Sequence, residues 1–270
     1  MNVGYSKGYR LTQSALWVVL WVAMAMILTT PAAVAQQLKS PVEIITGEPT
    51  HQVFDSGRAQ VTLLELFSSQ GCSSCPPAER WISQLKTDDR LWSHVVPVVF
   101  HVDYWDYLGW PDPYASLQHS QRQRLYQIHG RSNAVYTPGF MLSGKEWTGW
   151  FQNPALPELP SGSPGQLIVK RDGRNLEARF TSDGDYRALV LNVAVLGCDL
   201  VTEIKKGENS GLLMDQDFVV LSHQTYKSSD GSWDVHLPKT SVEGTRAVAF
   251  WVSEAMDPVP IQATGGWLPP

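Results

Sequence analysis

Two apolar runs in the first half of the chain have the pattern of strands that are buried on both faces. Residues 61–67 read Val-Thr-Leu-Leu-Glu-Leu-Phe, and residues 95–102 are also mainly apolar. Runs of this kind are typical of the inner strands of an α/β sheet, because helices cover both faces of such a sheet. We therefore expect these two segments to lie side by side in the core.

Helices are predicted after each of these runs. Residues 76–86 begin with two prolines, which a first helical turn tolerates, and they place Ala78, Ile82 and Leu85 on one face. Residues 114–129 are mostly polar and are followed by Gly130, which predicts a helix with a solvated face that ends at this glycine.

The pattern changes in the second half of the chain. Pro138 precedes a short apolar run that predicts a hairpin, and residues 153–165 are so rich in proline and glycine that we interpret them as a linker. Short strand-like runs then recur between turn signals, at 166–171, 176–182, 188–196, 218–226, 233–237 and 246–253. This series predicts a β-sandwich. The expected fold is an α/β domain over residues 36–152 and an all-β, sandwich-like domain over residues 166–270.

The first residues have the three parts of a secretory signal peptide in the usual order. Two basic residues precede an apolar stretch at about 15–28, and Ala33-Val34-Ala35 follows it. We expect residues 1–35 to be removed after Ala35, leaving no membrane span, and the protein to be exported to the periplasm or the extracellular space. The alternative is an uncleaved anchor over residues 11–30, because about 20 apolar residues span a bilayer.

The net charge and the number of cysteines exclude some classes of protein. The net charge of −5 becomes −7 without the two basic residues of the signal, and the charges are scattered, so we expect no nucleic-acid partner. The chain has three cysteines, too few for a disulfide framework in a domain of this size. We predict that Cys198 is a buried free thiol, with intermolecular pairing as the alternative.

The candidate chemistry lies in Cys72-Ser73-Ser74-Cys75, directly after the first predicted strand and at the start of the first helix. The helix N-terminus favours the thiolate of the first cysteine, and the spacing allows the two thiols to form a disulfide. This layout predicts thiol–disulfide exchange. A permanently oxidised structural disulfide is one alternative. Metal binding is another, although a structural zinc needs about four ligands and the chain has one such pair.

His101 ends the second predicted strand and could add a metal ligand beside the thiols. A single histidine is more often a hydrogen-bonded structural residue, so we predict no metal site and no bound cofactor.

Two longer stretches carry a resemblance to a known family. Residues 65–77, Glu-Leu-Phe-Ser-Ser-Gln-Gly-Cys-Ser-Ser-Cys-Pro-Pro, and residues 101–110, His-Val-Asp-Tyr-Trp-Asp-Tyr-Leu-Gly-Trp, resemble a bacterial family of secreted thioredoxin-like proteins catalogued as a domain of unknown function, DUF1223. The resemblance spans most of the mature chain. It implies a thioredoxin-like domain over residues 36–152 and a signal peptide, but it supplies no reaction.

The thioredoxin pattern also implies roles for individual residues. Cys72 would be the nucleophile, Cys75 the resolving thiol, and Pro138 a cis-proline that faces them. The chain departs from that pattern in three ways: the dipeptide between the cysteines is Ser-Ser, no tryptophan precedes Cys72, and the segment from Cys75 to Pro138 is long.

Two further site residues are predicted on the same basis. A cis bond at Thr137-Pro138 would leave the Thr137 backbone free to pair with an extended peptide, whereas an ordinary edge-strand proline is the alternative. Glu65 lies near where thioredoxin-like enzymes place a buried acid that moves protons for the resolving thiol. Its side chain could instead face solvent or pair with Arg80.

The aromatic segment after the second strand contains Tyr104, Trp105, Tyr107 and Trp110. These side chains could form a wall that receives a partner protein, because tyrosine and tryptophan bring large contact areas at low entropy cost. They could equally form a small core under a long loop.

Together these features predict an exported protein that exchanges disulfides with thiols or disulfides of other exported proteins through Cys72 and Cys75. A non-catalytic binding protein with a structural disulfide is the second hypothesis. A Cu(I)-handling protein that uses Cys72, Cys75 and His101 is the third.

Overall fold

The two predicted inner strands form the centre of the structure, a computed structural model. Strand β2 (Thr62–Ser68) runs parallel to β3 (Val95–His101), in a register that pairs Thr62 with Val95 and Ser68 with His101. Every residue of both strands is buried, as the apolar pattern predicts. The structure describes residues 51–269 except 153–154, 187 and 245, so the predicted signal peptide, residues 1–35, lies outside the described residues.

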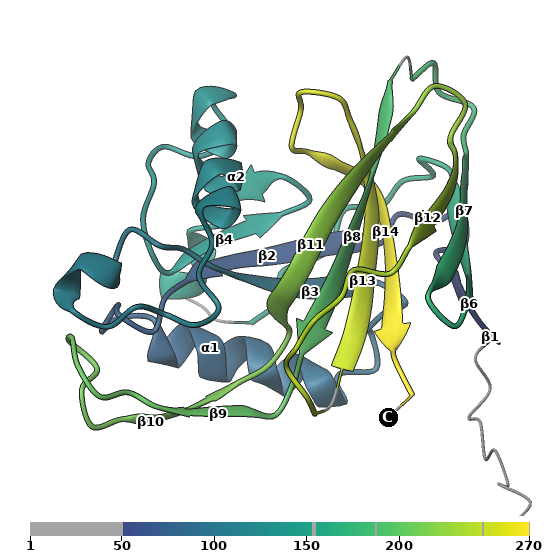
Figure 1. The fold of residues 1–270 in the computed structure, drawn as a ribbon. Helices are drawn as coiled ribbons and strands as arrows, with labels where there is room; N and C mark the ends of the chain where they lie inside the picture. The colour runs from purple at the N-terminus through teal and green to yellow at the C-terminus, as the bar shows by residue number, and fades with distance from the viewer. Residues whose placement is uncertain (1–50, 153–154, 187, 245, 270) are drawn as a thin grey trace, which may run out of the picture. The chain divides into compact units, whose positions relative to one another are not determined.

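The two α-helices of the described chain cover opposite faces of these strands (Figure 1). Helix α1 (Pro76–Ser83), which continues as the 3₁₀ turn η1 (Gln84–Thr87), contacts β2 through Ser68. Helix α2 (Leu117–Ile128) begins after Ser116, whose Oγ accepts a hydrogen bond from the Gln118 N–H, and it contacts β2 through Glu65. Because successive strand residues point to opposite faces, these two β2 side chains belong to different layers.

The central pair belongs to an eight-stranded mixed sheet of order β14-β13-β8-β11-β3-β2-β4-β5. On one side of the pair lie β4 (Gly139–Leu142) and β5 (Lys145–Glu146), the predicted hairpin. On the other side lie β11 (Val219–Ser228), β8 (Leu189–Gly197), β13 (Arg246–Glu254) and β14 (Pro260–Trp267). Strand β11 joins β3 in parallel where Val219 pairs with Val99, and the Val99 N–H donates to the Phe218 carbonyl at 2.9 Å.

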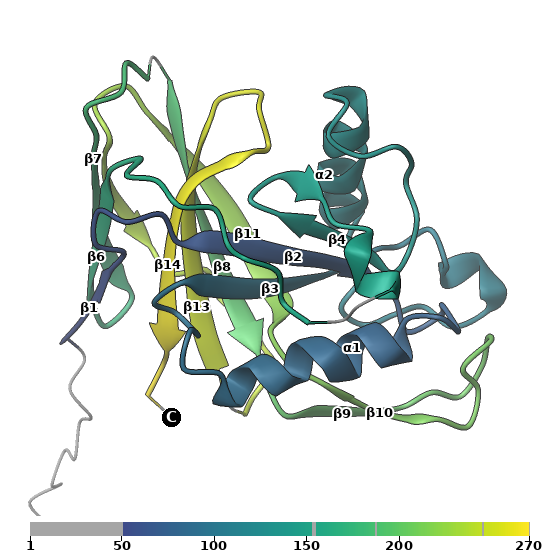
Figure 2. The ribbon, with the colours of Figure 1, turned by 180° about the vertical axis from the view of Figure 1, so that it is seen from behind.

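A four-stranded antiparallel sheet and a separate hairpin complete the described structure (Figure 2). The sheet has the order β1-β6-β7-β12, with β1 (His51–Asp55), β6 (Gln166–Asp172), β7 (Asn175–Thr181) and β12 (Ser232–His236). A second cluster of buried apolar side chains lies between this sheet and strands β8 and β13. The hairpin consists of β9 (Leu200–Glu203) and β10 (Leu213–Gln216), and β10 contacts α1.

Residues on both sides of the predicted linker at 153–165 share one sheet and one core. The first core cluster combines β2 and β3 with residues of β8, β11 and β13, and the described residues all belong to one compact unit. Strand β1, which precedes the predicted α/β strands, pairs with β6 beyond the linker. The described chain is thus a mixed α/β protein made mostly of strands, in which a mixed sheet with parallel strands accompanies an antiparallel sheet.

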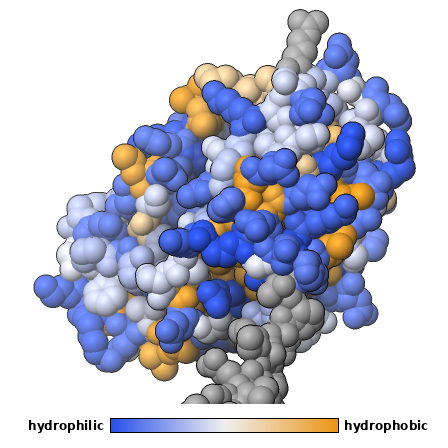
Figure 3. Space-filling model, turned by 45° about the vertical axis from the view of Figure 1, so that its right-hand side comes forward, coloured by the Kyte–Doolittle hydropathy of each residue, from blue (hydrophilic) through white to orange (hydrophobic). Residues whose placement is uncertain are grey.

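The described surface is predominantly polar on the face seen in Figure 3, where apolar residues form separate patches. Neither described helix is long and apolar enough to cross a membrane.

Candidate functional site: a buried dithiol at the start of α1

The two cysteines sit in the tight connection between β2 and α1. The Cys72 N–H donates to the Ser69 carbonyl at 3.2 Å, and the Cys75 N–H donates to the Cys72 carbonyl at 3.1 Å. Cys75 is the N-cap residue of α1, and Pro76 and Pro77 fill the first turn, where a missing N–H leaves no helical bond unmade. Both thiols are free and buried, and Cys72 is only 1% exposed.

Cys72 has the more acidic thiol of the two. A hydrogen bond from Cys75 lowers the pKa of Cys72 most, burial opposes that effect, and hydrogen bonds with Ser74 and Thr137 add to it, so the pKa falls to about 6. Its sulfur lies 3.3 Å from the Ser74 Oγ and 3.7 Å from the Thr137 carbonyl oxygen. Cys72 is therefore largely a thiolate at neutral pH.

Burial has the opposite effect on the second thiol. Desolvation raises the pKa of Cys75 well above its ordinary value, and the neighbouring Cys72 raises it further. Hydrogen bonding with Thr137 and Ser68 offsets this rise in the pKa of Cys75 only in part. The pair therefore combines an ionised sulfur with a protonated one.

The peptide bond Thr137-Pro138 is cis, as predicted, and it lies beside the dithiol. The Thr137 carbonyl also lies 3.5 Å from the Ser74 Oγ. From the other side, the indole N–H of Trp105 donates to the Thr137 hydroxyl at 2.8 Å. The structure thus brings Cys72, Cys75, Thr137 and Pro138 together.

The aromatic segment packs around this site, and most of its polar atoms have partners. Tyr104 donates to Gln123 at 3.1 Å, and the Trp110 indole N–H donates to the Gln70 side chain at 2.9 Å. Trp105 is fixed by Thr137, whereas Tyr107 is 77% exposed. Three of the four predicted wall residues are therefore held half-buried against the loop that carries the thiols.

Glu65 lies on the other face of β2, so the structure does not bring it to the thiols. It is fully buried; its Oε1 accepts from the Arg122 Nε at 2.6 Å, and its Oε2 accepts from the Tyr126 hydroxyl. Neither solvent nor Arg80 is its partner. The proton-shuttle role expected for Glu65 has no support in this position, because strand residues an odd number of positions apart point to opposite faces, and Ser68 faces α1.

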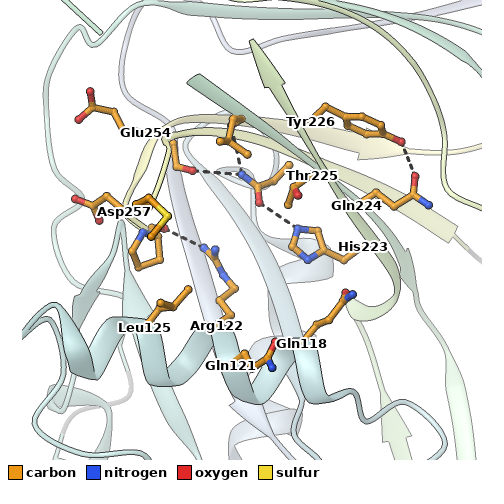
Figure 4. Close-up of a pocket in the computed structure, with 15 residues that line it drawn as sticks. Gln118, Gln121, Arg122, Leu125, His223, Gln224, Thr225, Tyr226, Glu254 and Asp257 are labelled. Atoms are coloured by element: carbon orange, nitrogen blue, oxygen red, sulfur yellow. Dashed lines mark hydrogen bonds between the residues drawn. The ribbon is translucent and has the colours of Figure 1, made fainter. Parts of the chain in front are cut away.

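Arg122, the ion-pair partner of Glu65, also lines a cavity of about 690 Å³ between α2 and β11 (Figure 4). The Arg122 guanidinium donates to the Pro258 carbonyl at 3.1 Å, and His223, across the cavity, contacts Asn192 through its Nε2 at 3.1 Å. The helix predicted to have a solvated face therefore buries an arginine.

A buried acidic cluster that the sequence analysis did not single out lies on the thiol side of β2. Glu79, four residues after Cys75, accepts a hydrogen bond from the Ser68 hydroxyl at 2.5 Å. His101 lies between Glu79 Oε1, 3.3 Å from its Nε2, and Asp112 Oδ2, 2.6 Å from its Nδ1. Burial alone would lower the pKa of His101, but the two carboxylates outweigh it and raise the pKa to about 10, so His101 is an imidazolium.

The hairpin β9–β10 contributes the remaining polar contacts of the site. The Asn209 side chain donates to the carbonyls of Gln70 and Cys72 at 2.8 and 2.9 Å, and Glu208 accepts from the Ser73 N–H at 3.1 Å. Gln216 of β10 accepts from the Gln70 side chain at 2.7 Å. These residues could not be assigned from the sequence, because they lie in the part of the chain beyond the predicted linker.

A family model described as a protein of unknown function (DUF1223) matches residues 63–253. The chain belongs to the DUF1223 family. The match includes the dithiol, the buried acidic cluster and the hairpin that contacts them. No curated protein matches the chain.

Two solved structures are similar to this DUF1223 chain. Protein AGR_C_4864 from Agrobacterium tumefaciens is 27% identical, with a TM-score of 0.54, over 77% of this chain and 94% of that one. HBP35 of Porphyromonas gingivalis is 15% identical, with a TM-score of 0.50, over 79% of this chain and 76% of that one, and this second likeness concerns the fold alone.

Two other predicted features of this DUF1223 protein have a place in the structure. Cys198 is buried and free, as predicted; burial raises its pKa to about 12, and its sulfur accepts from the Phe218 N–H at 3.4 Å. His101 is enclosed by carboxylates rather than by the thiols. Among the described residues, no group of three His, Cys, Asp or Glu side chains is arranged to hold a metal ion.

Proposed function

We propose that this DUF1223 protein is an exported thiol–disulfide exchange protein. The Cys72 thiolate attacks one sulfur of a partner's disulfide, forms a mixed disulfide and releases one partner thiolate. Cys75 then attacks Cys72, which releases the second partner thiolate and leaves a Cys72–Cys75 disulfide. Two electrons pass from the dithiol to the partner, and the reverse sequence oxidises a partner dithiol.

The observation that carries this proposal is the geometry around Cys72. Its sulfur lies at the start of α1, beside the protonated Cys75 and 3.7 Å from the Thr137 carbonyl. Helix N-termini and hydrogen bonds to the sulfur both favour the thiolate, which is the form that reacts.

The order of elements supports a thioredoxin-like arrangement for the first half of the chain. Strand β2, the dithiol, α1, β3, α2, the cis-proline and the β4–β5 hairpin follow one another as the resemblance implies. The sheet β1-β6-β7-β12, packed through apolar side chains against β8 and β13, supports the sandwich-like arrangement proposed for the second half.

The partner that fits this site is an extended segment of another exported protein. Such a segment would pair with the Thr137 backbone and reach Cys72 past Ser74, which is exposed. The exposed Tyr107 and the half-buried Trp105 would contact it.

The burial of Cys72 favours a second candidate, a binding protein in which the pair forms a structural disulfide. Because Cys72 is only 1% exposed, a partner disulfide reaches its thiol only after neighbouring residues move. A structural disulfide needs no such motion.

A redox titration separates these functions. The mature protein is equilibrated in glutathione buffers of known potential, and Cys72 and Cys75 are alkylated and measured by mass spectrometry. A midpoint between roughly −120 and −270 mV supports exchange, whereas a pair that stays oxidised below about −300 mV supports the structural disulfide. Cu(I) binding by the reduced protein alone, without exchange, would support the copper-handling alternative.

Substitution of the cysteines tests the direction of attack. Cys72→Ala abolishes exchange, and Cys75→Ala accumulates mixed disulfides with partner proteins, because nothing resolves them. Equal exchange by both variants and the unchanged protein would contradict the proposal.

A further inference from the structure

The cavity between α2 and β11 has the properties of a small-molecule site. Its volume of about 690 Å³ is in the range of cavities that hold such ligands. Part of its wall is apolar and comes from Leu125, Val190, Met256 and Pro258. Walls of this kind bind the apolar part of a ligand, and a few polar groups then select which ligand binds. The proposed exchange function does not use this cavity, because the dithiol lies at α1.

Arg122 brings an unused hydrogen-bond donor to this cavity. Its Nε donates to Glu65 at 2.6 Å, and its Nη2 donates to the Tyr126 hydroxyl and the Pro258 carbonyl at 2.9 and 3.1 Å. The other terminal nitrogen, Nη1, has no hydrogen-bond partner among the described residues, and it is not one of the polar atoms that are enclosed without a partner. A molecule in the cavity can therefore reach Nη1.

His223 brings a matching acceptor. Burial and the charges of Arg122 and His119 lower the pKa of His223 to about 3, so its imidazole is neutral at physiological pH. The Nε2 lies 3.1 Å from the Asn192 Oδ1, which can only accept, so Nε2 carries the proton and Nδ1 is an acceptor. Stacking on Trp251, with the ring centroids 5.1 Å apart, holds the ring in place. Within the described part of the chain Nδ1 has no partner, and it is not enclosed either.

The balance of charge around the cavity limits which ligands fit. The charged side chains that line it are Arg122, Glu254 and Asp257. The charge of Arg122 is already balanced by Glu65, so an anion would gain little from the arginine and would be repelled by the two carboxylates. A cation would face the Arg122 guanidinium, whose nitrogens can only donate. The cavity therefore favours an uncharged ligand.

We propose that this cavity binds an uncharged small molecule that has an apolar body and an amide group. The amide carbonyl accepts a hydrogen bond from Arg122 Nη1, and the amide N–H donates to His223 Nδ1. An amide offers an acceptor and a donor on neighbouring atoms and carries no charge. The apolar body packs against Leu125 and Met256, which line the same cavity. This site is separate from the dithiol, so it does not depend on the proposed exchange function.

Four probes of nearly the same size and shape test the charge and the hydrogen bonds of the ligand. Benzamide carries the neutral amide, acetophenone keeps the carbonyl but has no N–H, benzoate is an anion, and benzamidinium is a cation. Each probe is titrated into the mature protein, and heteronuclear NMR spectra follow the backbone amides of α2 and β11. We expect benzamide to bind saturably with a Kd in the millimolar range, because so small a ligand makes few contacts.

The other probes and two cavity variants should bind more weakly. Acetophenone should lose about 3- to 10-fold in affinity, because His223 Nδ1 then has no donor. Benzoate and benzamidinium should lose more than about tenfold, because each brings an unbalanced charge into the cavity. Gln121→Trp and Thr225→Trp each place a large ring at the wall of the cavity and should abolish saturable benzamide binding. Gln127→Trp is the matched control: Gln127 is exposed on the same helix but does not line the cavity, so binding should be unchanged.

Three results would overturn the proposal, with circular dichroism to check that each variant is folded. Absence of saturable benzamide binding, or equal binding by the two cavity variants and the unchanged protein, would show that the cavity is not the site. Benzoate or benzamidinium binding at least as tightly as benzamide would contradict an uncharged ligand. Acetophenone binding as tightly as benzamide would contradict the amide.

Discussion

Cys72 and Cys75 are neighbours in space with opposite environments. Cys72 has the exposed Ser74, the Thr137 carbonyl and the Cys75 thiol around its sulfur, whereas Cys75 is fully buried. A hydrogen bond from one thiol to the other stabilises a single negative charge on the pair, and the first charge disfavours a second one.

This arrangement predicts the titration of Cys72. The thiolate absorbance of the reduced protein rises through about pH 6, and Cys75→Ala moves this transition to higher pH, because the largest stabilising hydrogen bond is lost. Ultraviolet absorbance across pH measures both. Ser83→Ala, which affects a hydroxyl bonded within α1, is the control and leaves the transition in place. A Cys72 transition near pH 8.5 in the reduced protein would contradict the prediction.

His101 predicts a pH dependence of stability. Its folded-state pKa of about 10 exceeds the unfolded value of about 6.5, so its contribution is fully present below about pH 6.5 and is lost as the pH rises through about 10. Urea unfolding between these pH values should give a falling free energy of unfolding. Asp112→Asn removes the largest electrostatic attraction on the His101 imidazolium, so the free energy of unfolding should depend less on pH in this variant. An equal slope in both proteins would contradict this origin.

The hairpin β9–β10 is the element that connects the second half of the chain to the dithiol. Asn209 satisfies two loop carbonyls, and Gln216 joins the polar cluster under the loop. Buried carbonyls need such partners, because burial removes water.

We therefore expect Asn209→Ala to loosen the loop. Leaving the Gln70 and Cys72 carbonyls without their donor should lower the free energy of unfolding by about 1–3 kcal/mol and speed the alkylation of Cys72. Urea unfolding and iodoacetamide kinetics measure these effects. Asn133→Ala, which removes an exposed amide bonded to Glu146, changes neither. Unchanged alkylation and stability in Asn209→Ala would show that the hairpin does not hold the loop.

The hydrophobic pattern predicted those helices and strands whose secondary structure is determined by their own residues. The apolar runs became β2 and β3, the proline-led helix became α1, and the predicted polar helix became α2. Strands β9 and β10 were missed because each has only four residues, with polar and apolar positions mixed. Strand β14 has small residues near its end, where Gly265 approaches the Val248 carbonyl and the Trp92 ring, and its pattern alone gave no strand signal.

The eight-stranded sheet joins the two halves of the chain where β3 meets β11. The apolar face of β3 contacts residues of β11 and β13, so neither half covers its own core completely. A strand that loses its neighbour exposes backbone donors and acceptors together with its apolar side chains.

A fragment that ends at residue 152 therefore should not fold by itself. Residues 47–152 keep β2, β3, α1 and α2, but they lose β11 on one side of β3 and Gln216 and Asn209 at the dithiol loop. Circular dichroism and cooperative urea unfolding, compared with residues 47–270, test this. A fragment with a cooperative transition and the same Cys72 titration would mean that the first half is autonomous.

The site was predictable only in part, because side-chain direction depends on register. Local sequence was enough for the thiols, the helix that begins at them and the cis-proline. Glu65 and Glu79 are both acids near the cysteines in sequence. Only the packed structure shows that the first faces Arg122 and the second faces Ser68. The role of Asn209 depends on a contact across 137 residues, which no local pattern reports.

The separation of 137 residues between Cys72 and Asn209 affects the order in which the site is assembled. A chain is made from its N-terminus, so Cys72 and Cys75 emerge well before β11 and the β9–β10 hairpin exist. During this interval the chain has neither the carbonyl clamp of Asn209 nor the strand β11 that pairs with β3. The enclosure of the dithiol is therefore one of the last parts of the fold to be completed, because it waits for residues that follow the thiols by more than a hundred positions.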